Sequence, residues 1–89
     1  MTLSDEEIAA QLPDDWDREG EEIVRTYEFD DYLTGVDFAT DLAEIADEAF
    51  HHPELIIGFR SVEARLTSHE AGGITDDDIR LAEQFDDEY

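Results

Sequence analysis

Apolar residues recur at helical spacing through the middle of the chain. From residue 32 to about residue 50 they fall every three or four positions, and acids occupy the opposite face. This pattern predicts a long helix with one stripe facing a sheet. We expect His51-His52-Pro53 to end it, because proline disfavours helical geometry in the residue before it.

Two shorter helices are predicted near the ends of the chain. Ser4 and Glu7 have the spacing of a capping box, and the helix that they start must end before Pro13. Thr75 is the predicted cap of a last helix, whose first turn carries three aspartates at 76–78.

Four segments are predicted to be strands, at 16–19, 22–29, 55–60 and 62–68, and the second and the fourth alternate apolar and polar residues. In the second strand the apolar side chains share one face, which Arg25 interrupts. Turns are predicted at Gly20 and at 71–73, where glycines are free to adopt positive φ.

The elements follow the order α-β-β-α-β-β-α, and their short connections favour antiparallel pairing. We therefore predict an α+β fold over 1–89, as a single domain of two layers. A four-stranded antiparallel sheet should carry the helices packed on one face. So short a chain buries only about 60–65% of its unfolded surface, and its sheet has open edges, so we expect a homo-oligomer.

The charge balance separates this chain from ordinary small domains. It holds 27 acids and only 5 bases, all of them arginine, for a net charge of −22. This charge argues against nucleic-acid binding. Because 40% of the residues are hydrophobic, the chain is not a disordered acidic tail. We interpret it as a globular, halophilic protein; the alternative is an ordinary acidic protein with an interaction surface.

Features that the sequence lacks limit both the reactions that the protein can catalyse and the compartment in which we expect it. The chain has no cysteine, which excludes disulfides, thiolate catalysis and cysteine-ligated zinc. No apolar run approaches the ~18 residues of a membrane span, and the first residues lack the basic start of a secretory signal. We expect a cytoplasmic protein that does not bind membranes.

The chain contains three histidines, all near predicted element ends. His51 and His52 follow the long helix, and His69 follows the last strand, so the three can share one rim of the domain. Asp47 precedes His51 by four residues and would orient its ring if the helix continued that far. Asp47 could equally be one more surface acid, and Asp78 a helix N-terminal charge. A zinc site of three histidines is a further alternative, although no short His spacing pre-forms one.

The pattern D-x₃-H-H-P-x₅-F-x₉-H, from Asp47 to His69 and followed by Asp78, resembles the signature of pterin-4a-carbinolamine dehydratases. The stretch LTSHEAGGIT at 66–75 is similar to the same family. So are Leu-Pro at 12–13 with the tryptophan at 16, and the run F-x-D-Y at 29–32.

The resemblance implies a metal-free and cofactor-free enzyme. It would dehydrate 4a-hydroxytetrahydropterin to quinonoid dihydropterin and water, recycling the tetrahydropterin of an aromatic amino-acid hydroxylase. It also implies a homodimer or homotetramer. The alternative is a pterin-fold binding or dimerisation module without turnover, with a protein partner or a molybdopterin-related role.

The resemblance also implies roles for individual residues. His51 and His69 would be the acid–base pair on the two sides of C4a, and His52 would position the pterin ring. Asp47 would orient His51, and Asp78 would support the pocket rim electrostatically. The remaining substrate-binding or supporting residues would be Pro53, Phe59, Thr67 and Ser68.

The charge generates a first prediction, that folding depends on salt. Between ~0.1 M and ~2 M KCl the Debye length falls from about 10 Å to less than about 3 Å, which screens the repulsion among acids. We expect the melting temperature and the helical circular dichroism to rise steeply over this range. A melting temperature that stays flat would contradict the halophilic interpretation.

Overall fold

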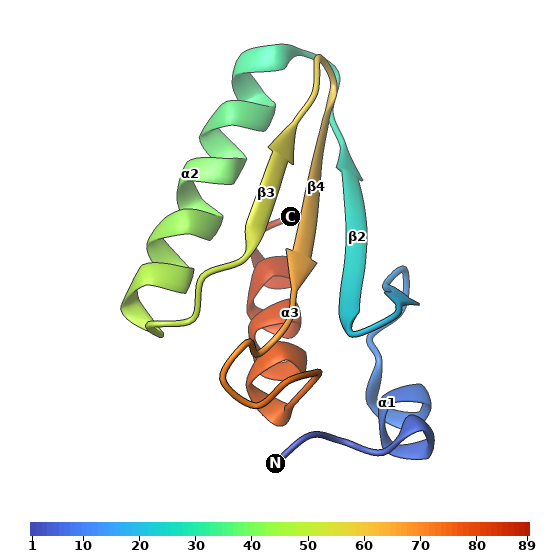
Figure 1. The fold of residues 1–89 in the computed structure, drawn as a ribbon. Helices are drawn as coiled ribbons and strands as arrows, with labels where there is room; N and C mark the ends of the chain where they lie inside the picture. Colours follow the sequence, from blue (N-terminus) through green and yellow to red (C-terminus); the bar gives the residue numbers. More distant parts are fainter.

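A computed structural model describes all residues from 1 to 89, and its four strands form one antiparallel sheet in the order β1-β2-β4-β3 (Figure 1). The strands are β1 (Asp17–Glu19), β2 (Glu22–Glu28), β3 (Glu54–Ile57) and β4 (Ser61–Leu66). The helices are α1 (Asp5–Gln11), α2 (Tyr32–Glu48) and α3 (Asp76–Glu88). This confirms the predicted α+β class and the predicted order of elements. None of the helices combines the length and the apolar character that crossing a membrane requires.

The core lies between the sheet and the helices. In β2 and β4 the alternating apolar residues pair directly, Ile23 with Leu66 and Tyr27 with Val62, and all four are fully buried. Leu42 of α2 is equally buried against them. Each such side chain contributes roughly 1.5–3 kcal/mol through burial. Sixteen buried residues form this single cluster, and it holds the long helix against the sheet.

Arg25, the interruption in β2, points toward the helices and is neutralised there. Its guanidinium lies 2.8 Å from Asp86 of α3, which also accepts hydrogen bonds from the Tyr27 hydroxyl at 2.7 Å and the Trp16 indole at 3.0 Å. Burial, and then the hydrogen bond to Asp86, raises the pKa of Tyr27 far above its ordinary value, so the phenol remains a donor. One carboxylate therefore joins α3 to β2 and to the segment before β1.

The long helix ends earlier than predicted, at Glu48. Phe50 adopts a left-handed backbone, with φ of 52°. Its N–H donates to the carbonyl of Asp47 at 3.1 Å, and the N–H of His51 donates to the carbonyl of Ala46 at 3.0 Å. These two bonds form a Schellman motif, which satisfies the last carbonyls of the helix and reverses the chain before the two histidines.

The β3–β4 hairpin also differs from the prediction. Its turn is 58–60, where the prediction continued a strand, because the Gly58 N–H donates to the carbonyl of Ser61 at 2.8 Å and closes the loop. Strand β4 ends at Leu66, and beyond it only Ser68 and Gly73 form an isolated bridge. The glycine turn predicted at 71–73 is present, and Gly72 has a φ of +81°.

The Asp86 cluster generates a second prediction. Asp86→Ala leaves the Arg25 guanidinium, the Tyr27 hydroxyl and the Trp16 indole without their shared acceptor. We expect the free energy of unfolding to fall by about 3 kcal/mol in urea titrations at high KCl. Asp87→Ala is the matched control, because Asp87 neighbours Asp86 on α3 but is exposed. Equal stability of the two variants would contradict the structural role of the cluster.

Candidate active site

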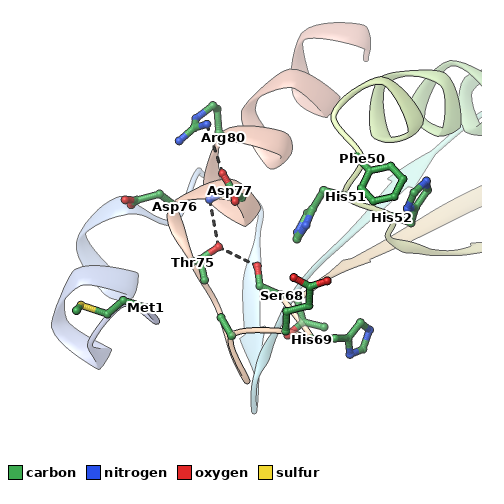
Figure 2. Close-up of a pocket in the computed structure, with 13 residues that line it drawn as sticks. Met1, Phe50, His51, His52, Ser68, His69, Thr75, Asp76, Asp77 and Arg80 are labelled. Carbon is green, nitrogen blue, oxygen red and sulfur yellow. Dashed lines mark hydrogen bonds and ion pairs between the residues drawn. The ribbon is translucent and has the colours of Figure 1, made fainter.

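Three segments meet at one end of the sheet and, together with Met1, line an open cavity of about 760 Å³ (Figure 2). They are the connection from α2 to β3, the loop from β4 to α3, and the first turns of α3. All three histidines of the chain line this cavity, so the structure brings His51, His52 and His69 together as the sequence predicts. Phe50, Thr67 and Ser68 are also part of its wall.

His51 is paired with a buried carboxylate. Its Nε2 lies 2.6 Å from Oδ1 of Asp78, whose side chain is completely buried. The other oxygen of Asp78 accepts from the Ser68 hydroxyl and from the Thr75 N–H, both at 2.8 Å. A carboxylate at Nε2 favours the tautomer with its proton on that nitrogen, so Nδ1 of His51 is left as an acceptor.

Asp78 serves the helix and the site at once. Its Oδ2 takes part in the capping box with Thr75 that starts α3, and its Oδ1 contacts Nε2 of His51. Asp78 is thus the helix N-terminal charge that the sequence offered as one interpretation, and its contact with His51 is compatible with the other. The capping bond turns the carboxylate inward beneath the cavity wall, where it is completely buried.

The predicted pair of Asp47 with His51 is wrong. Asp47 instead lies 3.0 Å from Nε2 of His52, and both side chains are largely exposed. The cause is the left-handed Phe50, which ends the helical face before His51 and turns that ring inward. The His52 ring then lies edge-on to the ring of Phe50, with 5.6 Å between the centroids and 76° between the planes.

His69 enters the cavity from the loop after β4. The Ser68–Gly73 bridge and the hydrogen bonds from the Ala71 and Gly72 N–H groups to the Ser68 carbonyl, at 3.1 and 2.9 Å, hold this loop. The imidazole of His69 is exposed and has no hydrogen-bond partner within the chain. Figure 2 shows it on a different segment from His51 and His52, which both come from the end of α2. Both of its nitrogens are available to a ligand.

The other predicted site residues differ in their position relative to the cavity. Ser68 and Thr67 line the cavity, and the Thr67 hydroxyl also ties the loop to the Glu21 carbonyl at 2.6 Å. Pro53 follows the histidine pair but does not line the cavity. Phe59 is not in the site: it lies in the β3–β4 turn and is 71% exposed. Six residues of β4, at ~3.3 Å each, put about 20 Å between that turn and the histidine loop.

Phe50 and Arg80 are among the wall residues that the sequence did not predict; the others are Met1, Glu70, Ala71, Thr75, Asp76 and Asp77. Arg80 pairs with Asp77 at 3.4 Å in the first turns of α3. The signal for Phe50 was an aromatic residue at a helix end where glycine or asparagine is usual. No three His, Asp or Glu side chains in the chain lie close enough together to hold a metal ion.

Fold and site together define a small two-layer α+β protein with an imidazole-lined pocket over a buried carboxylate. The profile of the family described as "Pterin 4 alpha carbinolamine dehydratase" matches residues 1–88. The chain therefore belongs to the pterin-4-alpha-carbinolamine dehydratase family, as the motif around His51 and His69 indicated.

Relatives from halophilic archaea are highly similar over nearly the whole chain. A protein of Natronomonas pharaonis, provisionally named a pterin-4-alpha-carbinolamine dehydratase, is 64% identical over 96% of this chain and 92% of its own. One of Halobacterium salinarum, with the same provisional name, is 54% identical over 96% and 93%.

Two solved structures share the fold. A "transcriptional coactivator/pterin dehydratase" of Brucella melitensis has a TM-score of 0.92 at 28% identity, over 99% of this chain and 98% of that one. A pterin dehydratase-like protein described as a RuBisCO assembly factor has a TM-score of 0.66 at 19% identity, over 82% and 84%. The second likeness shows the fold alone.

Proposed function

We propose that the protein dehydrates 4a-hydroxytetrahydropterin to quinonoid dihydropterin and water, and so recycles a tetrahydropterin for an aromatic amino-acid hydroxylase. The observation that carries this proposal is the pair of His51 with the buried Asp78, inside a cavity that the other two histidines also line. The volume of about 760 Å³ suits a small molecule, since ligand pockets span about 300–1,000 Å³.

The reaction needs two proton transfers. The ring nitrogen beside C4a loses its proton, its electron pair forms the C=N bond, and the C4a–O bond breaks. The leaving hydroxyl gains a proton and departs as water. Imidazole performs both transfers near neutral pH.

His51 and His69 exchange these protons in our proposal, because they reach the cavity from two different segments. His51 acts through Nδ1, with Asp78 and Ser68 as positioning residues behind it. His52 positions the pterin ring, and Asp47 holds His52. Pro53 keeps the backbone at His52 extended, so the two adjacent imidazoles point apart.

A binding or dimerisation module without turnover is the second candidate. The Brucella protein, which is 28% identical to this chain, is named a transcriptional coactivator as well as a pterin dehydratase. This observation favours the binding module. Three histidines on one cavity and a carboxylate bound to one of them favour turnover instead. The net charge of −22 opposes direct contact with nucleic acid. A net charge of this size also suits a cytoplasm with molar salt, and we propose that the protein is cytoplasmic.

We propose that the protein assembles as a homodimer or homotetramer. Strand β3 is an edge of the sheet. Three apolar side chains on this strand and in the turn after it are exposed: Ile56 (47%), Ile57 (43%) and Phe59 (71%). An exposed apolar edge favours pairing with a second copy. Light scattering in 2 M KCl should give at least twice the chain mass of 10.2 kDa. A monomer at micromolar concentration would contradict the assembly.

The histidines generate the central prediction. His51→Ala or His69→Ala should lower kcat by roughly 10²–10³-fold, the usual scale of general acid–base help. His52→Ala should act mainly on KM. The assay generates 4a-hydroxytetrahydropterin in situ at high salt, with chelator present, and follows the quinonoid product by ultraviolet absorbance. The chelator should leave the wild-type rate unchanged, because proton transfer by imidazole needs no Lewis acid.

The two carboxylates provide a matched comparison for this assay. Asp78→Asn removes the negative charge beside His51 and leaves one acceptor oxygen for three donors, so it should lower kcat far more than Asp47→Asn. Asp47 contacts only the exposed His52. Full activity of the His51→Ala, His69→Ala double variant would overturn the acid–base proposal. Activity lost on chelation and restored by zinc would overturn the metal-free mechanism.

A further inference from the structure

Phe50 occupies a backbone position that usually belongs to glycine. It is the residue just after the cap of α2 in the Schellman motif, and its φ is 52°. Left-handed geometry is costly for a bulky side chain, whereas glycine and asparagine adopt it readily. The other non-glycine residue with positive φ, Asp15, is of a type that tolerates this geometry. The helix end therefore does not explain a phenyl group at this position.

Packing within the chain does not explain the phenyl group either. The side chain of Phe50 is 86% exposed and is not part of the hydrophobic core. A strained and exposed aromatic residue loses backbone stability and gains no burial in return. Strain of this kind tends to be kept where a residue serves a site.

The ring of Phe50 lies on the candidate active site. It is part of the cavity wall beside His51 and His52, as Figure 2 shows. Its edge-on contact with His52, at 5.6 Å between centroids, gives the exposed ring a defined partner. His52 is itself held by Asp47 at 3.0 Å. Asp47, His52 and Phe50 thus form a chain of contacts that ends in a free aromatic face at the cavity.

We propose that Phe50 is the stacking residue of the site: its ring is the apolar wall against which the flat bicyclic ring of a pterin lies. This inference rests on the proposed function, because the ligand is the same pterin. Stacking buries the exposed face of Phe50 when the ligand is bound and offsets the strain of its backbone. It also fixes the plane of the ligand relative to the histidines.

Phe50→Asn is the sharpest variant, because asparagine suits the left-handed backbone and removes the ring. We expect the Kd for 7,8-dihydrobiopterin and the KM to rise about tenfold, the scale of one aromatic stack. The kcat should change less than about threefold, and the melting temperature should stay level or rise. Phe50→Tyr, which keeps the ring, should retain the wild-type Kd. Leu33→Asn is the control, because Leu33 is 69% exposed on α2 and lies outside the cavity.

The outcomes separate this inference from the proposed function. Wild-type protein that binds 7,8-dihydrobiopterin without dehydrating the carbinolamine overturns the function, and a weaker Kd in Phe50→Asn then still supports the stacking role. Wild-type turnover with unchanged KM and Kd in Phe50→Asn overturns the stacking role alone. A smaller oligomer by light scattering, with Kd unchanged, places the ring at an interface and overturns it too. Wild-type protein that does not bind the pterin overturns both.

Discussion

The candidate site depends on one buried carboxylate. Asp78 accepts hydrogen bonds from Ser68 in the loop after β4 and from Thr75 at the start of α3, and it contacts His51 in the segment after α2. A buried charge is stable only when its oxygens are satisfied, so these three segments must meet where they do. The same bonds that start the last helix thus also set the position and the tautomer of one imidazole.

A single reversal of the chain gives the two adjacent histidines different surroundings. The Schellman motif at Phe50 ends α2 and directs His51 inward to Asp78, while His52 stays largely exposed beside Asp47 at the same cavity. The two adjacent histidines therefore have different environments: the side chain of His51 is mostly buried, and that of His52 is mostly exposed. In the proposed mechanism this difference assigns proton transfer to His51 and substrate positioning to His52.

The scarce arginines hold parts of the molecule that the acids would otherwise drive apart. Arg65, on the sheet face away from the helices, contacts Glu63, Glu19 and Glu22, and its pKa is raised first by the hydrogen bond to Glu63. Arg25 does the same for Asp86 on the covered face. Most other acids lie at the surface without a cation partner, where screening by salt replaces pairing. The ion pairs within the fold and the salt dependence that we predict thus both follow from the same charge balance.

The sequence by itself determined the order of the elements, the helix caps, the core faces of β2 and β4, and the three histidines as a motif. These features depend on neighbours a few residues apart, so periodicity and spacing reveal them. Only the tertiary structure decided which carboxylate serves which histidine, because His51 and Asp78 are 27 residues apart and meet through packing. It also removed Phe59 from the site, since β4 separates that turn from the histidine loop. Phe50 is a further example. The sequence shows that residue 50 is a phenylalanine, but only the folded structure shows its left-handed backbone and its exposed ring.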